Sequence, residues 1–443
     1  MHALNSRGVC FMFCIVLSAA ATSAQAQWTQ WGGPNRDFIG DAENLADAWP
    51  EDGPRRIWKR KLGFGYSSVL CDGDMLFTMY RNAITDETEY FVALSARTGE
   101  TVWEHANKAP LLEEPDQRWG GQGPNSTPLI IGERLYAVGS RNVLHCFNKK
   151  TGKLHWKRDL EKDYGAATDK HCGYCPSPIA YEKTIILAVG KPAPEEGAQG
   201  DREQADVPLE TRTRVDGHAL MAFDQKTGEL AWKNMDFAVD FSSPLIINFD
   251  GQAQLVFSSP DGLFGANPTN GDLLWHFPKR GGIITPLWNG RDILFYGTTD
   301  RNKGAAVKLT KQDGKTVPTE LWSNKKIRCA LATPVRIGDH MVCANDNILL
   351  GVDFNTGKRT WAKRGYTSPV LVYGGGKLIL LDEGGRLTLA ETSPERLNVL
   401  ANFQATEKYS CTAPTLVGQT LYVRDRKHIM ALDLSPTQQA RAD

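Results

Sequence analysis

We predict an all-β protein: an eight-bladed β-propeller of four-stranded antiparallel blades, closed by an N-terminal strand that completes the last blade. Three observations predict this fold class. First, eight apolar segments open on a small residue, which is usually followed by Pro. Second, eight endings resemble the pattern Thr-Gly-x-x-x-Trp. Third, the basic repeat length is about 40 residues. Such a short unit cannot bury its apolar faces alone, so consecutive copies are expected to pack against one another around a ring.

The endings and starts of the copies can be paired along the chain. The clearest ending runs from Ala222 to Trp232 (AFDQKTGELAW), and the eighth, at residues 430–434, stops before any Trp. The other endings close on Trp103, Trp156, Trp275, Trp322, Trp361 and Phe403. The starts lie at Ser67, Ser126, Ser177, Ser243, Thr285, Thr333, Ser368 and Ala413. Eight starts match eight endings, which predicts eight blades.

Each copy divides into four short strands. In the fourth copy, residues 243–248, 253–258, 263–267 and 272–277 are rich in β-branched and aromatic residues and are separated by turn signals. Pro near the start of a first strand removes no ladder hydrogen bond. The Thr-Gly pair suits the hairpin between the third and fourth strands, because Gly readily adopts the left-handed conformation that ends such a loop.

The Trp that closes a copy lies on the outermost strand, where its ring can be buried against the neighbouring blade. Removing a buried aromatic side chain costs about 3 to 5 kcal/mol. We therefore interpret these residues as structural blade-docking residues rather than as ligand contacts. The set comprises Trp58, Trp103, Trp156, Trp232, Trp275, Trp322 and Trp361.

The segment around Trp58 is expected to close the ring. The last copy ends at Leu434 without an outer strand, and the segment Arg56–Lys61 near the other end of the sequence has a strand-like pattern that could supply it. Closure in this way removes the two exposed sheet edges that an open stack of blades would present to other chains.

The first residues resemble a cleavable export signal. Arg7, an apolar run from Val9 to Leu17 and the small-residue pattern Ala24-Gln25-Ala26 are typical of a secretory signal peptide. We therefore expect a signal peptide at 1–26, a lead segment at 27–53, one propeller domain at 54–436 and a tail at 437–443. The expected location is secreted or periplasmic.

Composition narrows the class of partner. The chain has 51 basic and 51 acidic residues, so its formal net charge of zero gives no general attraction to nucleic acid. No segment after the signal has the 18 or so uninterrupted apolar residues of a membrane span. We expect a monomer without a transmembrane segment that binds a protein partner or a small-molecule or glycan ligand.

One pair of cysteines stands out from the others. Cys172 and Cys175 form a Cys-x-x-Cys pair, and Pro176 takes the place of the His that covalent haem attachment requires. In an exported protein a local disulfide is the first interpretation, followed by two thiols and then by a redox or metal role. The other cysteines after the signal lie on apolar strands and are interpreted as small buried side chains.

A binding site is expected on the face that carries the loops into each first strand and the loops between second and third strands. The longest insertions gather there, and long loops on a rigid scaffold commonly carry function. Polar and aromatic side chains in these loops form the candidate ligand face, although each could equally be a solvated charge or rim packing. The candidates are Arg118, Trp119, Gln122, Asn125, Asp169, Lys170, His171, Tyr174, Asp240, Arg328, Tyr366 and Tyr409. We identify no catalytic motif and predict no catalytic or metal-ligating residue.

The repeats resemble the pyrroloquinoline-quinone-like (PQQ-like) β-propeller repeat family, in its secreted bacterial branch. The resemblance rests on the opening Trp31–Asp37 (WGGPNRD), on Trp49-Pro50, on Ile57-Trp58-Lys59 and on the blade ending Asp224–Trp232. It extends from Trp28 to Leu434 and implies the propeller fold. Function does not follow from a shared fold.

Two branches of that family imply different activities. Quinoprotein dehydrogenases bind PQQ and calcium on the ring axis, stack the quinone on a Trp and use an Asp as the base. Cofactor-free relatives include the eight-bladed outer-membrane protein assembly factor. The calcium ligands, the catalytic Asp and the adjacent-cysteine disulfide of the enzymes have no match here, and no lipid-attachment cysteine like that of the assembly factor is apparent.

We therefore predict an exported non-enzymatic scaffold that binds a protein or small ligand through its loop-rich face and needs no cofactor. A role in cell-envelope assembly is one expectation. The alternative is a PQQ- and calcium-dependent dehydrogenase of alcohols or sugars, with Trp119 as the stacking residue and Asp169 or Asp240 as the base. A third reading is a carbohydrate-binding module whose aromatic rim includes Trp119.

Overall fold

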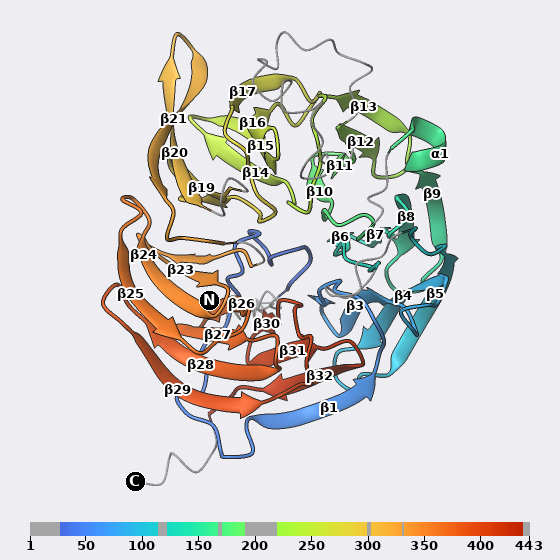
Figure 1. The fold of residues 1–443 in the computed structure, drawn as a ribbon. Coiled ribbons are helices and arrows are strands. Elements are labelled where there is room, and N and C mark those ends of the chain that lie inside the picture. Colours follow the sequence, from blue (N-terminus) through green and yellow to red (C-terminus); the bar gives the residue numbers. More distant parts are fainter. Residues whose placement is uncertain are drawn as a thin grey trace, which may run out of the picture.

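The computed structural model describes residues 27–113, 122–166, 171–190, 219–298, 303–329 and 332–436. Within these ranges the chain forms eight four-stranded antiparallel sheets arranged around a ring, together with one short helix, α1 (Leu160–Tyr164) (Figure 1). The predicted fold class, an eight-bladed β-propeller, is confirmed.

The first four blades follow the chain, each from its innermost to its outermost strand. Blade 1 comprises β2 (Leu70–Asp72), β3 (Met75–Tyr80), β4 (Thr88–Ser95) and β5 (Thr101–Lys108). Blade 2 comprises β6 (Leu129–Ile131), β7 (Arg134–Val138), β8 (Val143–Asn148) and β9 (Leu154–Asp159). Blade 3 comprises β10 (Ile179–Tyr181), β11 (Thr184–Ala188), β12 (Leu220–Asp224) and β13 (Leu230–Asn234). Blade 4 comprises β14 (Leu245–Phe249), β15 (Gln252–Ser259), β16 (Gly262–Ala266) and β17 (Leu273–Phe277).

The remaining blades complete the ring. Blade 5 comprises β18 (Leu287–Trp288), β19 (Ile293–Gly297), β20 (Gly304–Gln312) and β21 (Lys315–Asn324). Blade 6 comprises β22 (Val335–Ile337), β23 (His340–Asn345), β24 (Ile348–Asp353) and β25 (Arg359–Arg364). Blade 7 comprises β26 (Val370–Gly374), β27 (Lys377–Leu381), β28 (Arg386–Thr392) and β29 (Leu397–Gln404). Blade 8 comprises β30 (Thr415–Val417), β31 (Thr420–Arg424), β32 (His428–Asp433) and β1 (Arg55–Lys61).

Blade 8 joins the two ends of the propeller. Strand β1 pairs antiparallel with β32 from Arg55 opposite Asp433 to Lys61 opposite His428. The Arg55 guanidinium also donates to the Asp433 carboxylate at 2.6 Å. The closure predicted from the segment around Trp58 is thus confirmed, and blade 8 has the same four-stranded order as the others.

The repeated Trp and Gly residues meet across the seams between blades. The Trp103 ring of blade 1 lies over Gly152 in the outer hairpin of blade 2, and its Nε1 donates to Lys149 O at 2.7 Å. The Trp58 ring of blade 8 lies over Gly99 of blade 1 in the same way. Three further seams repeat the arrangement, with the pairs Trp156–Gly228, Trp232–Gly271 and Trp322–Gly357. The Gly of the repeat thus serves two purposes: it adopts a positive φ and leaves room for the neighbouring ring.

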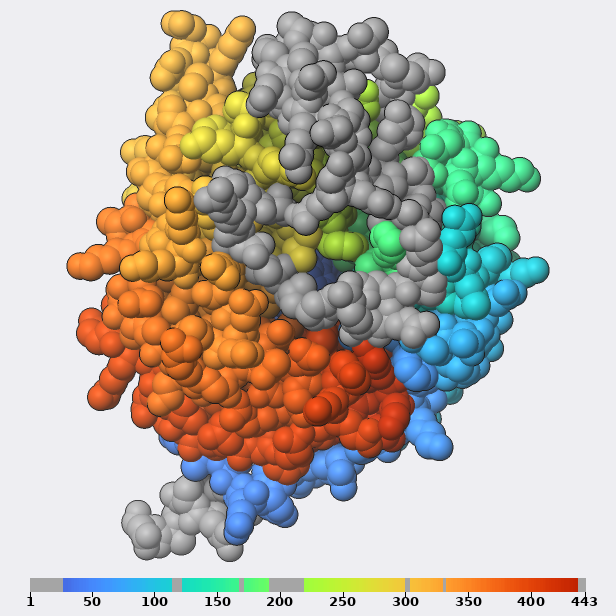
Figure 2. Space-filling view, in the orientation of Figure 1, coloured from blue at the N-terminus to red at the C-terminus, as the bar shows by residue number. Residues whose placement is uncertain are grey.

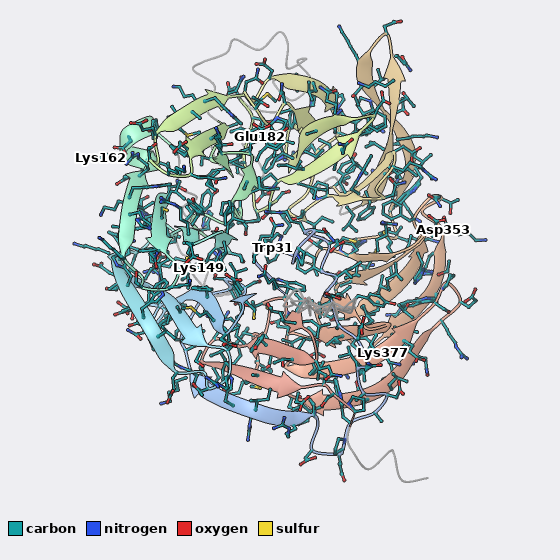
Figure 3. All side chains as sticks on the ribbon, turned by 180° about the vertical axis from the view of Figure 1, so that it is seen from behind. Trp31, Lys149, Lys162, Glu182, Asp353 and Lys377 are labelled. Atoms are coloured by element: carbon teal, nitrogen blue, oxygen red, sulfur yellow. The ribbon has the colours of Figure 1, made fainter. Side chains whose placement is uncertain are left out.

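The lead segment crosses the ring instead of running along its outside. Its backbone pairs with blade 1 through Trp28 and Cys71 and with blade 7 through Ile39 and Tyr373. Trp31 Nε1 donates to Thr285 Oγ1 before blade 5 at 3.1 Å. Figure 2 shows a hollow in the middle of the loop-rich face with the blue lead at its base, and Figure 3, drawn from behind, shows Trp31 near the centre of the ring. The lead therefore covers the end of the central channel opposite the loop-rich face.

Two of the predicted segments, the signal peptide at 1–26 and the tail at 437–443, lie outside the described residues. In the part of the chain that the structure describes, no helix is long and apolar enough to cross a membrane.

Candidate functional site

The loop-rich face carries an arginine held between two aromatic rings, which we call the Arg426 cluster (Tyr66, Tyr409 and Arg426). The Arg426 guanidinium donates to Tyr66 Oη at 2.8 Å, and its carbon Cζ lies 3.8 Å from the centroid of the Tyr409 ring. Burial raises the pKa of Tyr66 to about 12. Tyr409 itself is 40% exposed, so the cluster presents an aromatic surface to solvent.

Local backbone bonding explains how Arg426 is presented. Asp425 is buried, and its Oδ1 accepts hydrogen bonds from the amides of Lys427 and His428, both at 2.7 Å, which fixes the turn between β31 and β32. On the other side, Arg424 is buried and donates to Met79 O at 2.9 Å and to Gly63 O at 3.1 Å, and burial lowers its pKa to about 10. The turn is therefore anchored to blade 1, so the backbone that carries Arg426 is held in place.

A second feature of this face is a cationic pocket of about 420 Å³, lined by blade 6 and by the loop that leads into it from blade 5. Lys325, Lys326 and Arg328 come from the loop that leads from β21 into blade 6, and Arg364 comes from the end of β25. The turn between β23 and β24 contributes the single carboxylate, that of Asp346. None of the four cations forms an ion pair with a carboxylate among the described residues, so the pocket is basic.

Exposed apolar side chains also gather on the loops that lead into first strands. Leu111 is 37% exposed, Phe241 36% and Tyr409 40%, before blades 2, 4 and 8 respectively. The other large exposed hydrophobic residues of the described chain, Ile57, Val102 and Leu321, lie on the outermost strands β1, β5 and β21. Three blades therefore each expose an apolar side chain on the loop-rich face.

Several residues of the candidate ligand face lie outside the described residues, namely Arg118, Trp119, Asp169 and Lys170. Gln122 is buried and is bonded within the protein, because its Oε1 accepts from Leu112 N and its Nε2 donates to Ile84 O. Asn125 donates to Cys172 O at 2.9 Å and so links the loops before blades 2 and 3. Through these hydrogen bonds Gln122 and Asn125 hold loops of the protein together, which is a structural role.

The other candidates are spread around the ring rather than gathered at one point. Tyr174 and Tyr366 are buried, and Arg386 lies over the Tyr366 ring at 4.8 Å. Asp240 accepts a hydrogen bond from Phe241 N at 2.9 Å. His171 is half-buried beside the Cys172–Cys175 pair. Arg328 lines the cationic pocket and Tyr409 belongs to the Arg426 cluster, so these two have the most exposed positions.

Cys172 and Cys175 are half-buried, and no disulfide joins them in this structure. The Cys175 thiol lies 3.5 Å from Gly173 O and 3.6 Å from Asn125 Nδ2. The local disulfide expected from their spacing is therefore not formed here, and its formation on oxidation stays a prediction.

Sequence reasoning missed most of the charged residues on this face. Arg426 and Tyr66 are 360 positions apart and meet only because the ring closes. Lys325 and Lys326 belong to a loop and Arg364 to the end of β25, although the run Lys325-Lys326 beside Arg328 was a visible charge signal.

A site for calcium and PQQ would require ligands for the metal, a stacking Trp and an Asp base. Among the described residues, no group of three or more His, Cys, Asp and Glu side chains is placed to hold a metal ion. Asp240, one predicted base, accepts a hydrogen bond from its own chain, and the predicted stacking residue Trp119 and the other base Asp169 lie outside the described ranges. Since Trp119 and Asp169 lie outside the described residues, no step of chemistry is derived through calcium or PQQ.

The fold defines the protein class: an eight-bladed β-propeller. The family model for outer membrane protein assembly factor BamB matches residues 87–281. The resemblance predicted from the repeats is thereby confirmed. A search of the curated proteins found no match.

Solved structures are similar over most of this chain. BamB from Moraxella catarrhalis has 12% sequence identity and a TM-score of 0.54, with 86% of this chain and 99% of that chain covered. Sqt1 of Saccharomyces cerevisiae has 10% identity and a TM-score of 0.56, with 89% and 100% covered. A quinohemoprotein alcohol dehydrogenase from Pseudomonas putida HK5 has 13% identity and a TM-score of 0.46, with 93% and 80% covered. At these identities the similarity is one of fold.

Proposed function

We propose that this protein is an exported, non-enzymatic scaffold of the bacterial cell envelope that binds a protein partner through its loop-rich face and needs no cofactor. One observation carries the proposal: Leu111, Phe241 and Tyr409 are exposed on the loops of three different blades on that face. Scattered single apolar residues need no explanation, but three on one face, of which Tyr409 packs against Arg426, are typical of an interface.

The Arg426 cluster and the cationic pocket support the same conclusion. Arginine and tyrosine are enriched among the residues that contribute most to protein interfaces. Arg426 is held between Tyr66 and Tyr409, so little side-chain entropy is lost when a partner covers it. The lysines and arginines of the pocket would favour a partner with an acidic patch.

The test is a pull-down from the exported fraction with two matched triple variants. The first replaces Leu111, Phe241 and Tyr409 with Ser, and the second replaces Ile57, Val102 and Leu321 with Ser. Both remove three exposed hydrophobic side chains from the described chain. We expect one partner to be captured by the wild type and by the outer-strand variant but lost from the loop-face variant. Equal capture by both variants, or no specific partner, would contradict the proposal.

The alternative function is a PQQ- and calcium-dependent dehydrogenase, for which the repeat resemblance is the support. Titration of the purified protein with PQQ and Ca²⁺, followed by dye-linked oxidation of alcohols and glucose, separates the two functions. Tight binding of PQQ with turnover would overturn the scaffold proposal, whereas a protein that binds neither would retain it.

A further inference from the structure

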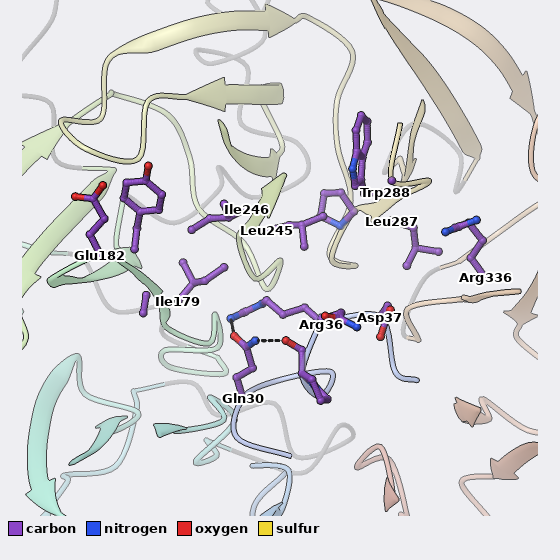
Figure 4. Close-up of a pocket in the computed structure, with 16 residues that line it drawn as sticks. Gln30, Arg36, Asp37, Ile179, Glu182, Leu245, Ile246, Leu287, Trp288 and Arg336 are labelled. Carbon is purple, nitrogen blue, oxygen red and sulfur yellow. Dashed lines mark hydrogen bonds between the residues drawn. The ribbon is translucent and has the colours of Figure 1, made fainter. Parts of the chain in front are cut away.

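The face opposite the loops carries a pocket of about 520 Å³ between the lead segment and the inner strands of blades 3 to 6 (Figure 4). We call it the lead pocket. In Figure 4 Glu182 and Arg336 lie at opposite ends of the view, and the lead contributes Gln30, Arg36 and Asp37. Trp288 belongs to β18. The pocket is thus lined partly by the lead and partly by four blades.

The lead adopts a demanding backbone conformation to place these side chains. Arg36 has φ 59° and Phe38 has φ 60°, both in the left-handed region that side-chain-bearing residues rarely adopt. Gly32, with φ 72°, has no room for a Cβ, which would lie 2.9 Å from the Arg36 backbone. Such conformations cost about 1 to 3 kcal/mol each and are found at binding sites where the surroundings hold them in place.

Arg36 is the most unusual residue of the pocket, because it is a charged side chain with only 2% exposure. Its guanidinium donates to Pro178 O at 2.9 Å, to Ser177 O at 3.2 Å and to Gln30 Oε1 at 3.3 Å, and no carboxylate of the described residues pairs with it. Burial lowers the pKa of Arg36 to about 9. Its Nε has no hydrogen-bond acceptor within the described chain. Arg36 is therefore a fixed and buried part of the pocket wall.

The charges around the pocket balance. Arg36 and Arg336 contribute two cations, and Asp37 and Glu182 contribute two carboxylates. The Asp37 carboxylate accepts from Ile39 N at 3.1 Å, and burial raises its pKa while the nearby Arg336 lowers it. A polyanion such as a phosphate chain would meet the two carboxylates, so this charge pattern disfavours it.

The side chains also share a geometry. Gln30, Asn35, Arg36, Asp37, Glu182 and Arg336 all end in planar groups that donate or accept two hydrogen bonds side by side. Tyr181 and Trp288 add flat rings, and both are half-buried with part of the ring in reach of solvent. A purely apolar ligand would cover the exposed amide of Asn35 and carboxylate of Glu182 without giving them partners, at a cost in free energy.

We propose that the lead pocket binds a neutral saccharide. A sugar ring has one apolar face that can stack on Trp288 or Tyr181, and neighbouring hydroxyls that pair with the planar amide, carboxylate and guanidinium groups. This inference is independent of the proposed protein partner, because the pocket lies on the face opposite the Arg426 cluster.

The experiment is a binding measurement on the full protein with three neutral trisaccharides: cellotriose, maltotriose and chitotriose in its N-acetylated form. Calorimetry and saturation-transfer NMR are the readouts, and a trigalacturonate serves as the anionic counterpart. We expect at least one neutral trisaccharide to bind, more tightly than the anionic one. Trp288→Ala should weaken that binding at least about tenfold, as expected when a stacking contact is lost.

Two further variants keep the test decisive. Glu182→Gln keeps the shape of an exposed side chain but removes its charge and one acceptor, so it should weaken binding several-fold without a change in melting temperature. Tyr409→Ala removes an exposed aromatic ring from the opposite face and should leave sugar binding unchanged. Failure of all three neutral sugars to bind, tighter binding of trigalacturonate, or loss of binding only in Tyr409→Ala would each overturn the proposal.

Discussion

Two seams of the propeller hold neighbouring blades together by different means. In the seam between blades 1 and 2, the Trp103 ring lies over Gly152 and its Nε1 donates across the seam to Lys149 O. In the seam between blades 4 and 5, Trp275 donates instead to Gln254 of its own blade at 2.6 Å. Gln254 then donates to Thr316 of blade 5 at 2.9 Å. The second seam therefore places a buried amide between the tryptophan and the next blade.

The difference follows from the hairpin of the following blade. Strands β20 and β21 have 9 and 10 residues, whereas β8 and β9 have 6 each. The longer hairpin places Gly314 where no atom lies within 4 Å of a built Cβ, whereas a Cβ at Gly152 would lie 2.6 Å from the Trp103 ring. In the seam between blades 4 and 5, the glycine at the hairpin tip is therefore not packed against any ring.

The largest expected effect concerns the one seam that joins the two ends of the propeller. Deletion of residues 54–62 removes β1 and Trp58, whose ring lies over Gly99, and leaves the edge of β32 unpaired. We expect an aggregating protein or one with a much lower melting temperature, measured by calorimetry and light scattering. An unchanged melting temperature would contradict the role of β1 in closing the ring.

Truncation of Trp103 should have the next largest effect. Trp103→Ala should lower the free energy of unfolding by about 3 to 5 kcal/mol, because a buried ring and its hydrogen bond are lost. Val102→Ala is the matched control. Val102 lies next to Trp103 on β5 but is 51% exposed, so its truncation should change stability little. Denaturant unfolding measures both, and equal effects would show that Trp103 does not dock the blades.

Glycine substitutions compare the two seams directly. Gly152 and Gly314 have φ 69° and 76°, so alanine at either position costs about 1 to 2 kcal/mol of backbone strain. Gly152→Ala should cost a further 1 to 3 kcal/mol or so, because its methyl group would overlap the Trp103 ring. Urea unfolding of the pair tests this difference, and identical losses would mean that the ring moves aside freely.

The stability of the protein should be sensitive to acid because of the seam between blades 1 and 2. His145 is buried between blades 1 and 2 beside Phe91 and Phe147, and burial lowers its pKa from 6.5 to about 3. The folded state thus keeps His145 neutral while the unfolded state takes up a proton. Its contribution is fully present above pH 6.5 and is lost as the pH falls from 6.5 toward 3.

The expected loss is about 1.4 kcal/mol for each pH unit below the ordinary histidine pKa. His145→Phe should make the decline of melting temperature between pH 6.5 and 4.5 shallower, even if it lowers stability at pH 8. The seam between blades 4 and 5 uses the uncharged Gln254 and Thr316, so Gln254→Ala should leave the pH slope unchanged. An identical slope in wild type and His145→Phe would assign the acid sensitivity elsewhere.

Much of the fold could be predicted because it is repeated. The fourth copy was expected at 243–248, 253–258, 263–267 and 272–277, and β14 to β17 lie within about two residues of those bounds. Period-2 apolar patterns and turn residues are local signals, so they can be read without knowledge of the neighbours. Closure by the segment around Trp58 was also predictable, because the last copy lacked its outer strand.

The sites were less predictable, because they depend on contacts between distant segments. The opening Trp31–Asp37 was noticed as a family resemblance, but its course across the ring, where Arg36 reaches Pro178, follows from no local pattern. Similarly, Gln122 has the side chain of a ligand-binding residue, yet the backbone groups of Leu112 and Ile84 occupy it. Local sequence cannot show which polar group is already bonded within the protein.

The course of the lead also constrains how the chain can fold. Trp31 bonds to Thr285, Asn44 to Gln419 and Arg55 to Asp433, over separations of 254, 375 and 378 residues. Contacts of such range slow folding, since loop-closure entropy is lost before they form. During synthesis, residues 27–61 emerge first but gain their last partners only after the final blade has been made. Until then β32 lacks its neighbour, so nascent chains should depend on a holding chaperone to avoid aggregation.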